Sequence, residues 1–190
     1  QGKRWQVHAP QVAWRPNWVD NVEDERGLMY QSKILGTGSY LPEKTITNFD
    51  LEKMVETSNE WILERTGIKE RHIAAEDEAA SDIGMVAAKR ALEAAKLTAQ
   101  DIDAIVFATV SADQLMPTAA NMLQYKLGCR PIMSFDLSAA CSGFVYALTV
   151  ADSFIKTGLY KTVLVVAAEV LHHNVDYTDR ETCILFGDGA

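Results

Sequence analysis

Residues 132–158 read IMSFDLSAACSGFVYALTVADSFIKTG, and this stretch decides the class of fold. Its first six residues form a largely apolar run with one acid, which has the length of a strand. Small residues at 138–140 suit a tight turn. The chain is then mostly apolar or small until Gly158, which suits the left-handed end of a helix. The stretch therefore predicts a strand, a turn and a helix of about four turns.

This arrangement places Cys141 at or near the N-terminus of a helix. Free backbone N–H groups and the helix dipole favour an anion there, so a thiol should ionise more easily and act as a nucleophile. Ala139 and Gly143 are small and would leave room for a substrate to approach the sulfur. The alternative is a structural cysteine, because free cysteines often pack as small buried hydrophobes. The strand–turn–helix pattern alone leaves both interpretations open.

Strand-like and helix-like segments alternate along the rest of the chain. The predicted strands are 32–41, 103–110, 132–137, 162–168 and 183–186. The predicted helices are 49–56 with Asn48 as its cap, one that follows a capping box of Thr57 and Glu60, 81–96 with Ser81 as its cap, 118–127, and 142–158. This alternation predicts an α/β fold with a mostly parallel sheet between helical layers.

Composition excludes several classes of function. The chain has 190 residues, 48% of them hydrophobic and 23% charged, which is typical of a globular protein. Its net charge of −8 argues against nucleic acid as a partner, and no apolar run is long enough to span a membrane. Cys129, Cys141 and Cys183 have no metal-binding or pairing spacing, so we expect no metal and a reducing compartment.

A second cluster of chemistry-bearing residues lies between positions 61 and 72. Trp61, Arg65, Lys69, Arg71 and His72 place an aromatic ring among cationic or titratable side chains. Such a group could bind an anionic aromatic ligand such as a nucleotide-bearing cofactor, or it could be a solvated amphipathic surface. Both interpretations remain open from the pattern.

The glycine pair in Gly36-Thr37-Gly38 is a weaker signal. The third glycine of a dinucleotide-binding loop is absent, because position 41 is Leu. We therefore favour a plain strand turn over a phosphate-binding loop.

Residues 1–28 show neither helical nor strand periodicity and read as an irregular extension, with an aromatic docking peptide as the alternative. The first residue is Gln1, and the chain stops at Ala190 directly after Phe186-Gly187-Asp188-Gly189. We expect the chain to be a piece of something longer.

Four motifs carry a resemblance to a known family. They are ILGTGSYLPE at 34–43, TSNEWILERTGIKERHIA at 57–74, FDLSAACSGFVYAL at 135–148 and DRETCILFGDGA at 179–190. In order and spacing they resemble the N-terminal half of a 3-oxoacyl-[acyl-carrier-protein] synthase III. This is the initiating condensing enzyme of type II fatty acid synthesis and has a thiolase-like fold. The resemblance implies a truncated thiolase-like domain over residues 29–190.

The resemblance also implies roles for individual residues. Cys141 matches the nucleophile that accepts an acyl group. The residues that match contacts to coenzyme A are Thr57, Trp61, Arg65 and Arg180, with Trp61 and Arg65 holding the adenine. Met116 and Phe186 match walls of the acyl pocket, and the Met116 loop crosses a dimer interface in the family.

The resemblance further implies the reaction partners. Acyl-CoA is a substrate and no separate cofactor is expected. Malonyl-acyl-carrier protein is the second substrate, and the full-length form is a cytoplasmic homodimer. The family's catalytic His and Asn belong to the C-terminal half, and none of the four histidines here lies in a matching motif. We therefore expect either a fragment of an acyltransferase or a non-catalytic half that only associates with a complementary chain.

Overall fold

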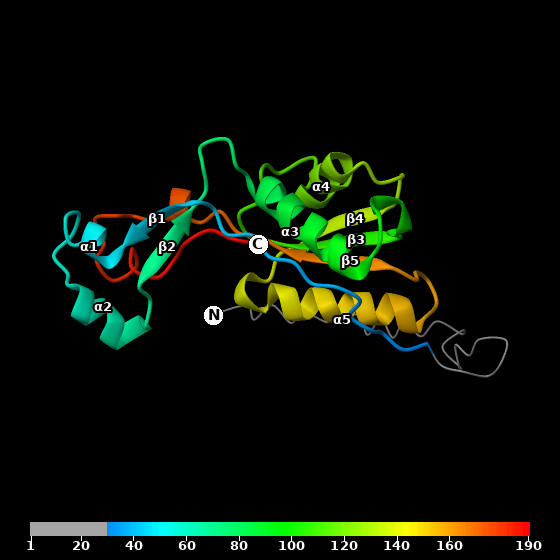
Figure 1. The fold of residues 1–190 in the computed structure, drawn as a ribbon, viewed down its shortest axis with the longest axis horizontal. Coiled ribbons are helices and arrows are strands. Elements are labelled where there is room, and N and C mark those ends of the chain that lie inside the picture. Colours follow the sequence, from blue (N-terminus) through cyan, green and yellow to red (C-terminus); the bar gives the residue numbers. More distant parts are fainter. Residues whose placement is uncertain (1–29) are drawn as a thin grey trace, which may run out of the picture.

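A computed structural model describes residues 30–190, and the predictions made for residues 1–28 lie outside this range. The described residues form two parts, which Figure 1 shows side by side. The larger part is a sheet with helices on both faces. The smaller part contains two short helices and a two-stranded ribbon. The α/β class predicted from the sequence is confirmed.

The larger part is built on a parallel sheet of order β4-β3-β5. Its strands are β3 Ala104–Ala108, β4 Met133–Leu137 and β5 Val163–Ala167. Ala104 is in register with Met133 on one side and with Val163 on the other. Every residue of the central strand is buried, as expected for a parallel sheet that is covered on both faces.

Helices α3 (Ala80–Ala95) and α4 (Ala119–Leu127) cover one face of this sheet, and α5 (Gly143–Lys156) covers the other (Figure 1). Thr118 caps α4, and Gly128 ends it in the left-handed conformation that favours glycine. Ser81 was predicted to cap α3 but lies inside it. Its N–H and hydroxyl instead donate to the carboxylate of Asp113. Three short 3-10 helices span Ala99–Asp101, Ala140–Ser142 and His172–Asn174.

The smaller part contains elements that the sequence patterns mis-assigned or missed. Strands β1 (Lys44–Thr47) and β2 (Glu70–Ile73) form an antiparallel ribbon that was not predicted. Helix α1 is only Asn48–Leu51, and Thr47 rather than Asn48 caps it. Helix α2 is Asn59–Thr66, and its cap is the hydroxyl of Ser58 rather than Thr57. Each cap was displaced by one residue because several adjacent side chains can accept the same N–H bonds.

Segment 183–186 was predicted to be a strand and is not one. The buried side chain of Arg71 holds it: Nε donates to the carbonyl of Ile184 at 3.0 Å, and Nη1 donates to Oδ1 of Asn48 at 2.5 Å. Burial lowers the pKa of Arg71. The buried carboxylate of Asp188 then accepts the N–H of Ala74 at 2.7 Å. These bonds attach the end of the described chain to the ribbon.

Segment 32–41 was also predicted to be a buried strand, and this is wrong for the described chain: residues 30–43 form no strand and are mostly exposed. The segment still packs tightly on α3. A Cβ added at Gly36 would lie 2.4 Å from the carbonyl oxygen of Ala91, and one at Gly38 would lie 2.3 Å from that of Ala87. The two glycines are therefore explained by close approach to a helix backbone.

Within residues 30–190, no helix combines the length and the apolar character that a membrane crossing requires.

The Arg71 contacts generate a stability prediction. Arg71→Met keeps much of the side-chain volume but leaves the Ile184 carbonyl and the Asn48 amide oxygen without their donor. We expect a loss of about 2–4 kcal/mol in the free energy of unfolding, measured by urea denaturation. Lys89→Met, at an exposed position on α3, is the control and should change stability by less than about 0.5 kcal/mol. Equal effects of both substitutions would contradict this role for Arg71.

Candidate active site

Cys141 lies in the turn between β4 and α5, as the sequence predicts. The residue before it, Ala140, has a φ of 46°, which is uncommon for a residue with a side chain and costs roughly 1–2 kcal/mol. The short helix Ala140–Ser142 then leads directly into α5. A strained turn at this point lets the cysteine project from the carboxyl end of a parallel strand, where ligands bind in open α/β sheets.

Gly143 has a packing role that the sequence did not predict. It is buried, and a Cβ at this position would lie 3.1 Å from the Cβ of Ala108 at the end of β3. The absence of a side chain therefore lets the start of α5 approach the sheet closely. Gly143 thereby lets the cysteine turn lie close against the central strand.

The three thiols differ in accessibility. Cys141 is exposed, Cys129 is half-buried and Cys183 is buried. Burial raises the pKa of both Cys129 and Cys183, and the charge of Asp179 adds to the effect at Cys183. A raised pKa lowers the fraction of reactive thiolate at neutral pH. Cys141 is therefore the thiol best placed to react with a substrate from solvent.

Glu169 joins the ends of two strands at the same edge of the sheet. Its carboxylate accepts the N–H of Val110 at 3.0 Å and the hydroxyl of Ser111. The Ser111 oxygen in turn accepts the N–H of Val170 at 2.8 Å. This arrangement fixes the loops that follow β3 and β5. Sequence reasoning missed Glu169, although an acid directly after a buried strand was a visible signal.

Asp113 anchors the loop after β3 at a second point. The carboxylate of Asp113 accepts from Ser81, and Nζ of Lys126 donates to Ser81 Oγ at 2.6 Å and to Asp82 Oδ1 at 2.6 Å. Beyond this anchor the loop tip is solvent-exposed: Leu115 is 93% exposed and Met116 is 80% exposed. Met116 is therefore presented on a held loop, and within residues 30–190 it is not buried in a pocket.

Trp61 is the centre of a second group of residues. The guanidinium carbon of Arg65 lies 4.2 Å from its ring centroid, and that of Arg180 lies 4.4 Å away. Nε of Arg180 is buried without a hydrogen-bond partner within residues 30–190, and so is the hydroxyl of Thr57. Two cations on one ring, one of them with an unpaired buried donor, suit an anionic ligand with hydrogen-bond acceptors. The structure thus groups Trp61, Arg65 and Arg180.

A cavity of about 280 Å³ adjoins this group. Its lining residues are Trp61, Arg65, Thr66, Glu181, Ile184 and Leu185. Phe186, the next residue in the chain, is 44% exposed and is not among them.

Two other predicted members of the cationic cluster, Arg71 and His72, make their contacts away from Trp61. Arg71 is buried against Ile184, and the ring of His72 contacts the Pro42 carbonyl oxygen through Nδ1 at 2.6 Å. The positions of Arg71 and His72 in the sequence could not show that they differ from Arg65. Both lie in β2, where successive side chains point to opposite faces. Among the described residues, no group of three or more His, Cys, Asp or Glu side chains is placed to hold a metal ion.

A cysteine in a strand-to-helix turn at the edge of such a parallel sheet is the arrangement of the thiolase-like fold, and the described chain has half of that fold. Solved structures support this. The 3-oxoacyl-[acyl-carrier-protein] synthase III from Aquifex aeolicus superimposes with a TM-score of 0.81 at 54% identity, covering 83% of this chain and 51% of that one. The priming β-ketosynthase of the R1128 polyketide pathway gives 0.82 at 38% identity, covering 85% of this chain and 48% of that one.

The sequence comparisons identify the family. The model of 3-oxoacyl-[acyl-carrier-protein] synthase III matches residues 135–190. The beta-ketoacyl-[acyl-carrier-protein] synthase III of Xanthomonas oryzae is 57% identical over 159 residues, which are 84% of this chain and 49% of the relative. This chain is therefore a homologue of beta-ketoacyl-[acyl-carrier-protein] synthase III, and it spans about half the length of the curated relatives it matches.

The difference among the thiols predicts selective alkylation. With iodoacetamide at pH 7.5, Cys141 should be labelled at least about tenfold faster than Cys129 or Cys183, as measured by peptide mass spectrometry. Because the pKa values of Cys129 and Cys183 are raised, their labelling should increase as the pH rises to 9 and beyond. Cys141→Ser should lose only the fast site. Labelling of Cys129 or Cys183 as fast as that of Cys141 at pH 7.5 would contradict the prediction.

Proposed function

We propose that this chain carries the acyl-accepting part of an initiating condensing enzyme of fatty acid synthesis in the cytoplasm, with Cys141 as the nucleophile. The substrates are a short acyl-CoA and malonyl-acyl-carrier protein. The single observation that carries the proposal is the exposed Cys141 in a strained turn between β4 and α5. Homology to synthase III adds the class of reaction.

The first half-reaction transfers an acyl group to sulfur. The Cys141 thiolate attacks the thioester carbonyl, a new carbon–sulfur bond forms, and coenzyme A leaves as its thiolate. The tetrahedral intermediate carries an oxyanion, which needs a donor already in position. The backbone N–H of Cys141 is suited to this, because it makes no hydrogen bond within residues 30–190, whereas those of Ser142 and Gly143 already donate to the carbonyls of Ala139 and Ala140.

The second half-reaction forms the new carbon–carbon bond. Malonyl-acyl-carrier protein loses carbon dioxide, and the resulting carbanion attacks the carbonyl of acyl-Cys141. The 3-oxoacyl product stays on the carrier protein, and the cysteine is released as thiolate. Decarboxylation also develops an enolate oxyanion, which requires its own donors. In the family that this chain resembles, a His and an Asn of the C-terminal half supply these donors.

We further propose that Trp61, Arg65, Arg180 and Thr57 bind the nucleotide end of coenzyme A. Two cations supply charge for its phosphates, and the unpaired donors at Arg180 and Thr57 supply hydrogen bonds. An adenine between Trp61 and Arg65 needs roughly 7 Å, about twice a normal van der Waals contact distance. The present 4.2 Å separation therefore requires Arg65 to swing away when the ligand enters.

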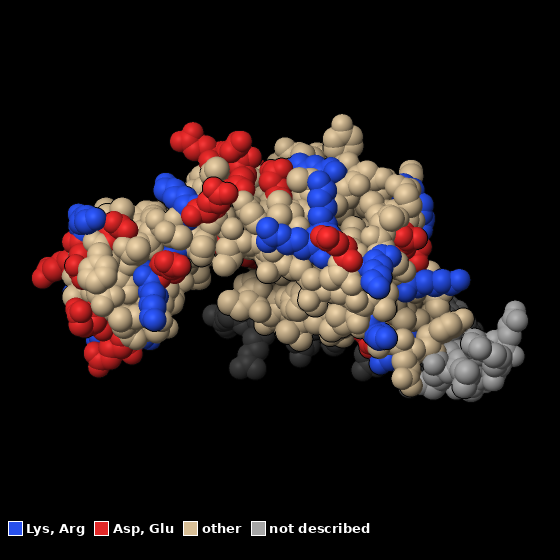
Figure 2. Space-filling model, in the orientation of Figure 1, with Lys and Arg blue, Asp and Glu red and all other residues tan. Residues whose placement is uncertain are grey.

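A second candidate function is association with a complementary polypeptide without turnover by this chain alone. It is supported by the outer face of α5, where Phe144, Val145 and Tyr146 are exposed. In Figure 2 the visible side of α5 carries almost no charge over most of its length. An uncharged apolar surface of this kind is typical of an interaction site. The family's homodimer remains a prediction for this chain.

Incubation with acetyl-CoA tests the acyl-transfer proposal. We expect intact-protein mass spectrometry to show one added acetyl group, mapped to Cys141 and removed by hydroxylamine. The Cys141→Ser variant should gain no such adduct, while Cys129→Ser should behave as the parent chain does. An adduct that appears only after a complementary half is added would favour the second candidate. Acetylation of Cys129 or Cys183 in place of Cys141 would refute the assignment.

Arg65→Ala tests the proposed ligand site separately from the thiol. Loss of one stacked cation should weaken coenzyme A binding roughly five- to thirtyfold, measured by calorimetry. The rate of Cys141 alkylation by iodoacetamide should stay within about twofold, because the small reagent does not need the nucleotide site. Lys69→Ala, an exposed cation nearby in sequence, is the matched control and should leave binding unchanged. Equal losses in binding and alkylation would show that the two roles are not separable.

A further inference from the structure

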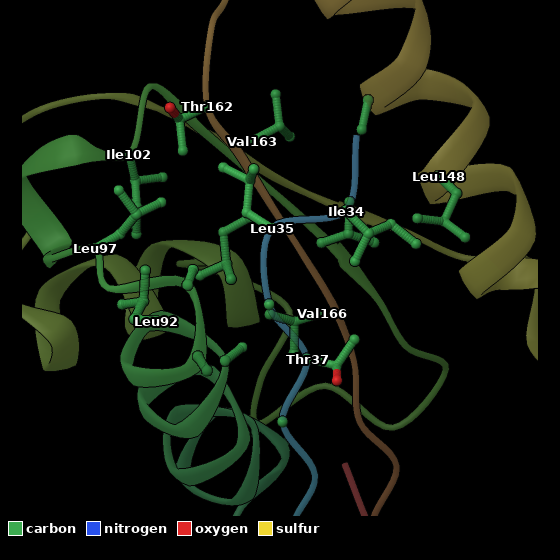
Figure 3. A pocket seen from close by; sticks show the side chains of 18 of the residues that line it. Ile34, Leu35, Thr37, Leu92, Leu97, Ile102, Leu148, Thr162, Val163 and Val166 are labelled. Atoms are coloured by element: carbon green, nitrogen blue, oxygen red, sulfur yellow. The ribbon is translucent and has the colours of Figure 1, made fainter. Parts of the chain in front are cut away.

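Two cavities within residues 30–190 differ in the charge of their walls. The larger, of about 460 Å³, has mostly apolar walls, and every side chain labelled in Figure 3 is uncharged. The smaller, of about 280 Å³, adjoins the Trp61 stack and is lined by a cation and an acid, Arg65 and Glu181. The cavity beside Trp61 is therefore where the charge of a ligand should matter most.

Glu181 is the acid of its loop whose carboxylate makes no contact in the described part of the chain. It is exposed, and only its backbone N–H is engaged, donating to Asp179 Oδ1 at 3.0 Å. The carboxylate of Asp179 accepts from the Thr182 hydroxyl at 2.5 Å, and that of Asp176 accepts from the Thr178 hydroxyl at 2.7 Å. Those two acids hold the loop, whereas the Glu181 carboxylate is left to act on a ligand.

The two arginines at Trp61 do not neutralise Glu181. Their guanidinium carbons lie 4.2 and 4.4 Å from the ring centroid, and neither Arg65 nor Arg180 forms an ion pair with Glu181 among residues 30–190. Yet Glu181 follows Arg180 directly in the chain and lines the same cavity as Arg65. The three side chains together carry one net positive charge, where the arginines alone would carry two.

We propose that Glu181 is a specificity-determining residue of this site, which limits how much affinity a ligand gains from each additional phosphate charge. The inference rests on the proposed function, because the ligand is taken to be the nucleotide end of coenzyme A. A phosphate carries nearly two negative charges at neutral pH. At roughly 8 Å in water, one carboxylate weakens the binding of such a group about fivefold before salt screens it.

An alternative role for Glu181 is to accept a hydrogen bond from the amino group of the base. Its exposure favours the charge role. An exposed carboxylate that bonds to a ligand gives up a bond to water, so the net gain is small. Repulsion of a phosphate acts over a distance comparable with the Debye length and needs no contact. The two roles predict opposite effects of removing the charge.

The charge role has a consequence for turnover. Under the proposed function, free coenzyme A has to leave after acyl transfer, and it carries the same nucleotide as acyl-CoA. Two unopposed cations would hold both equally tightly, which would slow departure without improving discrimination between them. Glu181 weakens the hold on the phosphates and thereby favours release of coenzyme A.

A series of nucleotides with increasing charge tests the proposal. Adenosine, adenosine monophosphate and adenosine 3′,5′-bisphosphate are titrated by calorimetry at about 0.01 M ionic strength, where the Debye length is about 30 Å. Glu181→Gln should tighten binding of the bisphosphate about four- to tenfold and of the monophosphate about two- to fivefold, and leave adenosine within about twofold. At about 1 M salt, where the Debye length is about 3 Å, these differences should disappear.

Two control variants separate the local charge from other effects. Glu181→Asp keeps the carboxylate and should bind all three ligands as the parent chain does. Glu76→Gln removes the same charge from an exposed position in the loop between β2 and α3, which does not line the cavity. It should change each affinity by less than about twofold, because the effect of a remote exposed charge is screened.

Fluorescence quenching measures the same charge without a nucleotide. Trp5, Trp14 and Trp18 are replaced by Phe, so that Trp61 is the remaining tryptophan of the sequence. Iodide is an anion and acrylamide is neutral, so only iodide responds to the local potential. Glu181→Gln should raise the iodide quenching constant at least about 1.5-fold at low ionic strength and leave the acrylamide constant unchanged.

Weaker binding of adenosine by Glu181→Gln would show a hydrogen-bond acceptor and overturn the proposal. Equal iodide quenching in the parent and Glu181→Gln chains would overturn it as well, whether or not a nucleotide binds. A parent chain that binds no nucleotide, but whose iodide quenching rises with Glu181→Gln, would refute the proposed ligand and support the charge effect of Glu181. Failure of this inference is therefore distinct from failure of the proposed function.

Discussion

Parallel pairing of β3 with both β4 and β5 is the constraint on which the rest of the structure depends. Because the three strands point the same way, the chain leaves all of them at one edge. Cys141 follows β4, the Val110–Ser111 bend follows β3, and Glu169 follows β5. The Glu169 carboxylate can bond to the loop after β3 only because β3 and β5 end together. The common direction of the strands thus places Cys141 at the same edge of the sheet as the Glu169 contacts.

Acidic residues carry much of the loop architecture. Asp136 accepts the N–H groups of Ala119 and Ala120 at the start of α4, and Asp103 accepts those of Lys161 and Thr162 before β5. Asp188 does the same for Ala74. Backbone N–H bonds favour the charged form of a carboxylate, and at Asp103 the guanidinium of Arg130 adds to their effect. Part of the net charge of −8 therefore has a structural use, and it says little about the charge of a partner.

The sequence was most informative where one pattern excluded the alternatives. Strand β3 and helix α5 were predicted correctly because a continuous apolar run, or a long apolar segment ending at a left-handed glycine, fits few other structures. The caps of α1 and α2 were displaced by one residue because the sequence has runs of capping side chains. Segments 32–41 and 183–186 have strand-like composition but form no strand here. A strand needs a backbone partner, which composition does not supply.

The candidate site could be predicted less completely, since it depends on contacts between distant residues. That Cys141 is exposed followed from its local turn, whereas the stacking of Arg180 on Trp61 joins residues far apart in sequence. The same end segment links this stack to the rest of the described chain. Within residues 180–190, Arg180 contacts Trp61, the Ile184 carbonyl accepts from Arg71, and Ala190 pairs with Tyr40. The segment that places Arg180 against Trp61 is therefore held at three points along its length, by the Trp61 ring, by the Arg71 guanidinium and by the backbone of Tyr40. The geometry of the anion site thus depends on contacts that lie far from it in the sequence.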